Sequence, residues 1–254
     1  MATIAVFNQK GGVGKTTTAL NVLAAIARRG QRPMGIDFDP QAHLSHVFGV
    51  QPRLADDSVY SFFLRQRPLA DLAVISASGV IVCPAHIELS KLDSALGKGV
   101  NVVTRLRTAL RGSEKVDGPV VIDCCPLLNV LSLNAVFACD VLLVPVSADF
   151  LALRGARAVD RALDALEPVF KRRLPRRYLL TRYDGRRRMS SEVADQMGAA
   201  FRTEEICVTR IRESVKLAES PALSLDVFRH APNSHGAEDY AALVEELAGA
   251  GFLR

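Results

Sequence analysis

The hydrophobic residues of this chain fall into short apolar runs that are separated by longer amphipathic segments. Runs rich in β-branched residues predict strands buried on both faces, because such strands need no polar positions. One predicted strand begins at Pro33 and is followed by two aspartates. The other predicted strands are residues 3–7, 72–76, 80–83, 120–123, 141–146, 178–181 and 205–209.

The segments between these runs have the period of amphipathic helices. The first predicted helix, residues 18–29, is closed by Gly30, and residues 151–166 form a long helix that Pro168 should end. We expect Ser190 or Ser191 to cap a helix over residues 190–201. The remaining predicted helices are residues 42–48, 58–65, 87–96 and 100–110, one starting at Leu131, and residues 236–247.

Alternation of strands and helices predicts an α/β fold, with a mostly parallel twisted sheet and helices on both faces. We expect a single domain over residues 1–254, a length at which one core is ordinary. The hydrophobic content of 49% excludes broad disorder. No apolar run approaches the roughly 20 residues that a membrane-spanning helix needs, and the first strand follows the N-terminus directly, so we expect a cytoplasmic protein.

Charge and cysteine content narrow the picture only slightly. The formal charge of +5 favours a polyanionic partner weakly, since a modest excess is usually a solvated surface. The chain has five cysteines without C-x-x-C spacing, which argues against a disulfide framework or a zinc site. Buried thiols are the simpler interpretation.

A glycine-rich stretch, residues 8–17, lies between the first strand and the first helix. Gly11, Gly12 and Gly14 lack the Cβ atoms that would hinder the backbone from curling around a phosphate. The amides and the helix N-terminus then face the anion, with Lys15 placed to reach terminal phosphates and Thr16 placed to bind Mg²⁺. The predicted nucleotide-binding residues are Lys10, Gly11, Gly12, Val13, Gly14, Lys15, Thr16 and Thr17.

Carboxylates follow two of the predicted strands. Asp37 and Asp39 come at the exit of the strand that begins at Pro33, and Asp123 ends the strand 120–123. Strand exits are where open α/β sheets build sites, so these acids are candidates for the magnesium shell or for orienting water. Asp39 could instead have only a structural role, as the cap of a helix that starts at Pro40.

The loop departs from the strict phosphate-loop pattern, because Gln9 replaces the first glycine and Lys10 is added. In this it resembles the deviant Walker-A ATPases, and the chain is similar to the ParA branch of the ParA/MinD family of P-loop NTPases along nearly its whole length. Further matches are D-x-D-P-Q at Asp37–Gln41 and the strand ending at Asp123, where Cys125 replaces a family proline.

The resemblance implies ATP and Mg²⁺ as ligands and a homodimer that forms when ATP is bound. Lys10 would reach the partner's phosphates and Lys15 would hold the nucleotide. Asp39 would act in hydrolysis, and the magnesium shell would involve Thr16, Asp37, Asp39 and Asp123.

Basic residues gather in two late segments, Lys171–Arg177 and Arg182–Arg188. Arginine runs suit phosphates, although a solvated loop explains them equally well. The family places a D-x-R turn for sequence-independent DNA contact where Asp184–Arg186 lies. By resemblance, the DNA-binding residues are Arg186, Arg187, Arg188 and Lys216, while Arg212 and Glu213 depart from the family pattern.

Four functions remain open at this stage. The first is chromosome or plasmid partitioning on the nucleoid, with a ParB-like partner stimulating hydrolysis. The second uses the same ATPase cycle and a cargo-adaptor protein to position a protein assembly. A MinD-like membrane regulator is disfavoured, because the last residues carry acids and glycines where a basic amphipathic helix would be needed. A metabolic P-loop enzyme is disfavoured by Lys10 and the arginine turn.

Overall fold

The computed structural model describes residues 2–97, 99–112, 118–171 and 173–253. Within these residues the strands form one seven-stranded sheet in the order β3-β4-β2-β5-β1-β6-β7, in which only the β3–β4 pair is antiparallel. The strands are β1 (Thr3–Val6), β2 (Met34–Asp37), β3 (Val74–Ile75), β4 (Ile81–Cys83), β5 (Val120–Asp123), β6 (Val141–Ser147) and β7 (Arg176–Thr181). The predicted fold class is confirmed.

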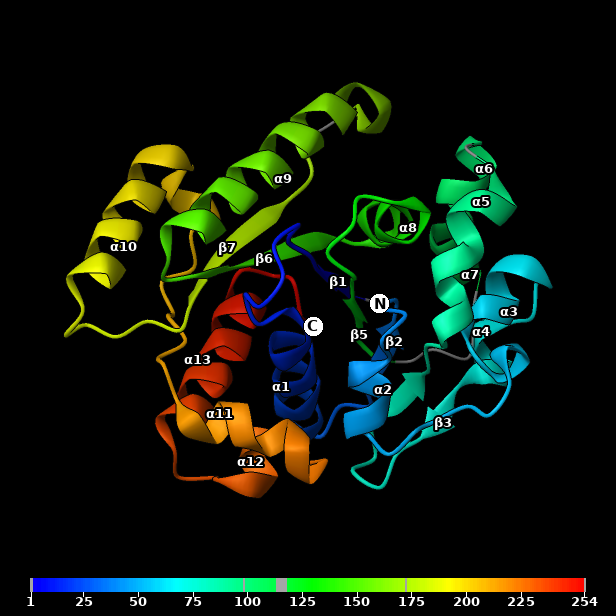
Figure 1. Cartoon of the computed structure of the whole chain (residues 1–254), viewed down its shortest axis with the longest axis horizontal. Helices are drawn as coiled ribbons and strands as arrows, with labels where there is room; N and C mark the ends of the chain where they lie inside the picture. The colour runs from blue at the N-terminus through cyan, green and yellow to red at the C-terminus, as the bar shows by residue number, and fades with distance from the viewer. Residues whose placement is uncertain (1, 98, 113–117, 172, 254) are drawn as a thin grey trace.

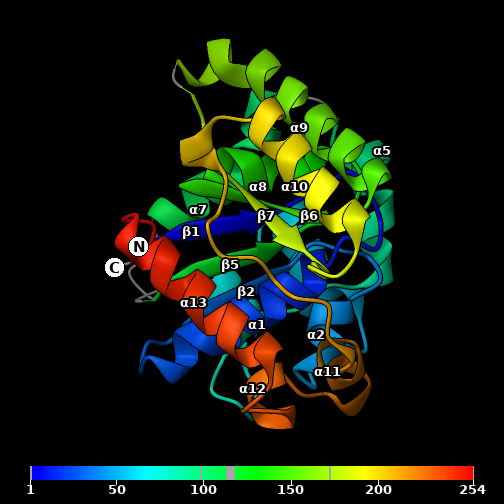
Figure 2. The same cartoon turned by 90° about the vertical axis from the view of Figure 1, so that its left-hand side faces the viewer.

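Helices cover both faces of the sheet, as Figure 2 shows with the strands seen between two helical layers. One layer contains α1 (Lys15–Arg28), α2 (His43–Val47), α11 (Val215–Glu219), α12 (Val227–His230) and α13 (His235–Gly249). The other contains α3 (Val59–Leu64), α4 (Leu69–Leu72), α5 (Leu92–Leu96), α6 (Val100–Val103), α7 (Arg105–Arg111), α8 (Val130–Ala138), α9 (Phe150–Phe170) and α10 (Arg188–Ala200). Their arrangement is visible in Figure 1.

Alternation along the strands explains the two layers. Ile4 and Val6 pack with α1 and α13, whereas Ala5 packs with the helices of the opposite face. Successive side chains of a strand point to opposite faces, so a strand buried on both sides contributes to two cores. Helix α1, whose residues 18–26 are buried, lies at the centre of its layer beside α13.

Two predicted helices are interrupted. Residues 100–110 form α6 and α7, because the Asn134 side chain takes the two backbone groups that a continuous helix would pair. Its Nδ2 donates to the Val102 carbonyl at 2.9 Å, and its Oδ1 accepts from the Leu106 N–H at 3.1 Å. The segment 87–96 likewise divides, into a 3-10 helix (Ile87–Lys91) and α5.

Three expectations for the second half of the chain are wrong. Helix α9 continues through Pro168 to Phe170, since a proline in the last turn removes a single hydrogen bond. Helix α10 begins at Arg188 without a serine cap, because the Ser190 hydroxyl accepts from the Asp184 N–H instead. Residues 205–209 form an isolated bridge, Ile206 with Tyr178 of β7, but no strand, because the Val208 and Thr209 amides donate to the Glu246 carboxylate.

Two predictions on smaller features can also be compared with the structure. All five cysteines are free and buried, as expected. Among the described residues, no helix is both long and apolar enough to cross a bilayer. Residues 113–117, and Arg172 of the first basic segment, lie outside the described residues.

Candidate nucleotide site and basic surface

The phosphate loop joins β1 to α1, as predicted. Gly12 has φ +76° and Gly14 has φ +87°, a left-handed conformation that residues with a Cβ rarely adopt. Gly14 immediately precedes the first turn of α1, and its carbonyl accepts from the Thr18 N–H at 2.8 Å. The amides at this helix start give a positively polarised site for an anion.

The two lysines of the loop have different partners. Lys15 is buried, and its Nζ donates to the Lys10 carbonyl at 3.0 Å across the loop. Burial lowers the pKa of Lys15, while Asp123 and Asp39 act in the opposite direction. Lys10 is more exposed, and its Nζ lies 2.7 Å from Oδ1 of Asp149.

Asp149 caps α9 and holds Lys10 at the same time. Its Oδ1 also accepts from the Ala152 N–H at 2.9 Å, and its Oδ2 accepts from the Ser147 hydroxyl at 2.5 Å. Burial acts to raise the pKa of Asp149, but the hydrogen bonds from Lys10 and Ser147 outweigh it, so the pKa lies below its usual value. The position of Lys10 is therefore tied to the start of α9.

Contacts from distant elements fix the loop in place. The Asn8 side chain donates to the Pro145 carbonyl at 2.7 Å and accepts from the Lys10 N–H at 3.0 Å. The Thr181 hydroxyl, at the end of β7, donates to the Val13 carbonyl at 2.9 Å. A Cβ added at Gly155 in α9 would lie 2.9 Å from Asn8 Oδ1 and 3.2 Å from Lys10 Cβ. The helix α9 therefore approaches the loop as closely as a glycine allows.

The predicted acids meet at the carboxyl edge of the sheet. In the β2–β5 register Asp37 is the direct partner of Asp123, and both are completely buried. Asp37 accepts hydrogen bonds from the Ser45 N–H at 2.9 Å, the Ser45 hydroxyl at 2.7 Å and the Asp39 N–H at 3.0 Å. Burial raises the pKa of Asp37 to about 6, although the Ser45 hydrogen bonds lower it. Asp37 thus anchors α2 to the end of β2.

Asp123 is the acid whose environment fits a cation. Both of its carboxylate oxygens are buried without a hydrogen-bond partner. Burial raises its pKa well above the usual value, Asp37 adds to this, and the Thr16 hydroxyl and Lys15 act in the opposite direction. An unpartnered buried carboxylate is costly unless something satisfies it.

The donor set suits magnesium bound together with phosphate oxygens. No group of three His, Cys, Asp or Glu side chains in the described part of the chain could hold a metal on its own. Magnesium usually keeps several waters and takes one or two protein ligands beside substrate phosphates. Asp123 and the Thr16 hydroxyl at the loop fit that pattern.

Asp39 lies in the loop between β2 and α2. Its Oδ1 accepts from the Gln41 N–H at 2.9 Å, and helix α2 begins later, at His43. The helix-capping alternative, with Pro40 as the first helical residue, is therefore wrong. Ala42, directly before the helix, has φ +53°, which is strained for a residue with a side chain.

The predicted DNA-binding residues are all exposed and come from three places: Arg186 and Arg187 from the loop after β7, Arg188 from the start of α10, and Lys216 from α11. Arg186 and Arg187 pair with Asp184 at 2.9 and 3.5 Å. Arg188 pairs with Glu192 at 2.7 Å, and Lys216 pairs with Glu219 at 2.9 Å. The hydrogen bonds from Arg186 lower the pKa of Asp184 to about 2.

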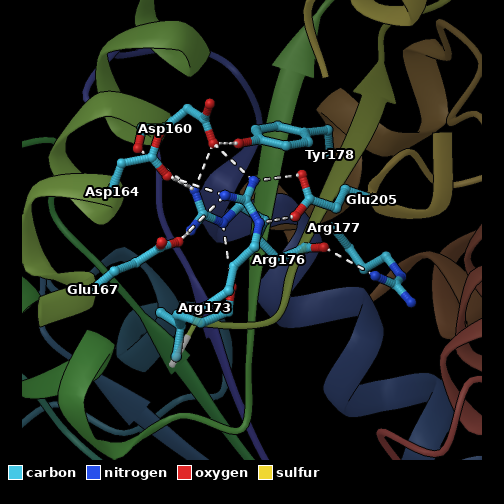
Figure 3. Close-up of polar contacts among 9 residues, drawn as sticks. Asp160, Asp164, Glu167, Arg173, Arg176, Arg177, Tyr178 and Glu205 are labelled. Carbon is cyan, nitrogen blue, oxygen red and sulfur yellow. Dashed lines mark hydrogen bonds and ion pairs between the residues drawn. The ribbon is translucent and has the colours of Figure 1, made fainter. Parts of the chain in front are cut away.

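Two arginines of the other basic segment, Arg173 and Arg176, belong to an ion-pair cluster (Figure 3). Arg176 is completely buried, and its guanidinium lies 2.5 Å from Asp160, 3.0 Å from Asp164 and 2.8 Å from Glu167. Arg173 bridges the same acids of α9 to Glu205, at 2.7 Å. These two arginines join α9, β7 and the segment after α10 and face protein carboxylates.

Four residues of these sites were missed from the sequence. Asp149 could have been found by the rule that identified Asp123, because it follows the carboxyl end of β6. No sequence signal marks Ser45, which donates to Asp37, or Thr181, whose partner Val13 lies far along the chain. Arg210, which stacks on the Tyr183 ring at 4.8 Å to the centroid, also had no signal.

Comparison with known proteins agrees with this arrangement. Residues 1–175 match the family model described as an AAA domain. The chain is 40% identical over 248 residues to the chromosome-partitioning ATPase Soj of Thermus thermophilus, covering 96% of this chain and 94% of that protein. It is 34% identical over 249 residues to the chromosome partitioning protein ParA of Caulobacter vibrioides, covering 96% and 92%. The chain belongs to the ParA/Soj family.

A solved structure supports the same fold for this ParA/Soj family member. The structure titled cobyrinic acid a,c-diamide synthase from Mycobacterium smegmatis, with bound ADP and magnesium, is 27% identical with a TM-score of 0.82. The match covers 99% of this chain and 96% of that chain. The predicted P-loop NTPase fold and the resemblance to the ParA branch are thereby confirmed.

Proposed function

We propose that this protein is an ATP-dependent switch that dimerises on binding ATP, binds DNA without sequence preference and hydrolyses ATP when a partner stimulates it. The observation that carries the proposal is the convergence of Lys10, Lys15 and the unpartnered Asp123 carboxylate at a glycine loop, in a chain of the ParA/Soj family. Relatives named for chromosome partitioning favour partitioning as its role.

Nucleotide binding is assigned to the phosphate loop. Lys15 exchanges its hydrogen bond to the Lys10 carbonyl for the terminal phosphates of ATP, a charge-assisted bond of greater strength. Thr16 and Asp123 hold magnesium, which neutralises phosphate charge when bound. Asp39 orients the attacking water. The three hydrogen bonds on Asp37 support a positioning role for that acid rather than direct ligation.

Dimerisation is assigned to the same edge of the molecule. Lys10 leaves Asp149 and reaches the partner's phosphates, where its charge offsets phosphate repulsion as the two sites close. Large apolar side chains are exposed at the ends of β5 and β6, next to the loop, and favour a protein interface. These side chains are Leu127, Leu128, Phe150 and Leu151.

DNA binding is assigned to the exposed arginines after β7 and to Lys216. A dimer aligns two copies of this surface, so the affinity for a polyanion rises when ATP is bound. Hydrolysis separates the subunits and releases the DNA. This cycle places the protein in the cytoplasm on the nucleoid, with a ParB-like protein or a cargo adaptor as the stimulating partner.

The first experiment measures binding to an arbitrary DNA duplex without nucleotide, with ADP and with ATP plus Mg²⁺, across a salt series. Tight DNA binding only in the presence of ATP and Mg²⁺ supports the proposal. The logarithm of the affinity should then fall against log salt with a slope of about 0.9 per phosphate contacted. Absence of DNA binding in every nucleotide state contradicts it.

A double variant separates the DNA surface from the dimer. Arg186→Glu with Lys216→Glu replaces two exposed cations by anions, so DNA binding should fall by at least about 100-fold while ATP-driven dimerisation persists. Gel filtration with a non-hydrolysable ATP analogue reports the dimer. Loss of dimerisation as well would place these residues at the subunit interface instead.

A further inference from the structure

The exposed cations that follow β7, and those of residues 210–216, are mostly neutralised by neighbours within the chain. We call the basic surface the exposed cations Arg182, Arg186, Arg187, Arg188, Arg210 and Lys216. Besides the pairs made by the predicted DNA-binding residues, Arg182 lies 3.0 Å from Glu213. A cation that already faces a carboxylate must exchange one anion for another when it binds a phosphate, so its net gain is small.

Arg210 is the exception on the basic surface. It is exposed, and it forms no ion pair with any residue that the structure describes. Its guanidinium carbon lies 4.8 Å from the centroid of the Tyr183 ring. Stacking on an aromatic ring engages the face of a guanidinium and leaves the N–H groups at its edge available for a phosphate.

Tyr183 holds this arginine beside the predicted DNA-binding turn. The Tyr183 N–H donates to the Ile211 carbonyl at 3.0 Å, and its carbonyl accepts from the Glu213 N–H at 2.9 Å. The ring also lies beside Gly185, where an added Cβ would be 3.6 Å from it. The stack therefore fixes Arg210 next to the Asp184–Arg186 turn.

The segment that carries Arg210 is itself anchored along β7. Cys207 N–H donates to the Tyr178 carbonyl at 3.0 Å, and Ile211 N–H donates to the Leu180 carbonyl at 2.9 Å. The Arg173–Glu205 pair of Figure 3 holds the start of the same segment. A pre-positioned side chain loses less conformational entropy on binding than a mobile one.

We propose that Arg210 is the principal phosphate contact of the basic surface, with Tyr183 as its positioning residue. The inference rests on the proposed DNA-binding function and adds a residue that the D-x-R turn did not predict. Arg210 gives up only solvent and counterions on binding a phosphate, whereas its neighbours give up carboxylates.

The test compares Arg210→Ala with Arg188→Ala, another exposed arginine, which is paired with Glu192. DNA affinity with ATP and Mg²⁺ is measured for several unrelated duplexes across a salt series. Arg210→Ala should weaken binding about 10-fold on every sequence and reduce the salt slope by about 1. Arg188→Ala should weaken it less than about 3-fold, because that charge is already neutralised.

Two further variants distinguish charge from position. Arg210→Lys keeps the charge and should recover part of the affinity, while Tyr183→Leu should lose affinity because Arg210 is no longer held. ATP-driven dimerisation is measured for each variant and should not change. An equal effect of Arg210→Ala and Arg188→Ala would overturn the inference alone, whereas a wild-type protein that binds no DNA would overturn the proposed function.

Discussion

The two lysines of the phosphate loop differ in what holds their ammonium groups. Lys15 lies inside the loop and donates to a backbone carbonyl, which a phosphate oxygen can replace without moving the chain. Lys10 lies at the start of α9 and pairs with Asp149. This ion pair must break before the Lys10 ammonium can contact another group. One lysine is therefore placed for the nucleotide of its own subunit and the other for an event outside it.

Replacing each lysine in turn should separate these two tasks. Lys15→Ala should weaken ATP binding about 100-fold, because a charge-assisted hydrogen bond contributes about 1.5–3 kcal/mol. Lys10→Ala should change ATP affinity less than about 3-fold, which is well under 1.4 kcal/mol of binding free energy, because Lys10 contributes little to ATP binding within its own subunit. The same variant should abolish ATP-driven dimerisation. Calorimetry with an ATP analogue and light scattering measure the two quantities. Tight ATP binding by Lys15→Ala would contradict the assignment of the loop.

At the scale of elements, the ion-pair cluster at the end of α9 has a mechanical role. Arg173 and Arg176 connect α9, β7 and the segment after α10, and the Tyr178 hydroxyl donates to Asp160 at 2.6 Å within the same cluster. Because Arg176 is completely buried, removing it leaves carboxylates without the cation that they surround. Two arginines of a basic stretch that suggests nucleic acid from its composition here bind carboxylates of the same chain.

We expect Arg176→Met to lower the free energy of unfolding by about 3 kcal/mol, the lower end of the range for breaking a buried ion pair, since its acids are partly exposed. The adjacent Arg177→Met is the matched control. Arg177 stacks over Phe252 at 4.8 Å and should cost less than about 1 kcal/mol. Urea unfolding measures both. Equal losses for the two variants would show that the cluster does not stabilise the fold.

What the sequence predicts at this scale depends on how local the cause is. The central strands could be predicted because β-branched runs buried on both faces leave a pattern in the chain itself. The split at residues 100–110 could not, because its cause is Asn134 on another helix. The phosphate loop and Asp123 follow from motif and strand exit, whereas the partners of Arg176 are brought together only by the fold.

At the scale of the whole molecule, one hydrogen bond links the two proposed binding sites. The Thr181 hydroxyl donates to the Val13 carbonyl in the phosphate loop, and Thr181 directly precedes the basic surface. The next residue, Arg182, has φ +55°, a conformation that costs energy for a residue with a side chain. The connection from the phosphate loop to the arginines is thus one side-chain hydrogen bond followed by a strained residue.

Thr181→Val keeps the branched shape and removes the hydroxyl. We expect nucleotide affinity within about 3-fold of the wild type, and an ATP-induced gain in DNA affinity that is reduced about 5-fold, the lower end of typical coupling energies. By reciprocity, the effect of DNA on ATP affinity should fall by the same factor. Thr203→Val, at an exposed position, is the control. Unchanged coupling in Thr181→Val would show that dimerisation alone links the sites.

The close approach of Gly155 to the phosphate loop has a consequence for how the molecule can be controlled. A methyl group at Gly155 would lie 2.9 Å from Asn8 Oδ1 and 3.2 Å from Lys10 Cβ, so α9 and the side chains of the loop are in close contact. A small tilt of α9 would therefore displace Lys10. The first turn of α9 exposes Phe150 and Leu151. A second protein that binds these side chains could therefore move Lys10 without entering the nucleotide site.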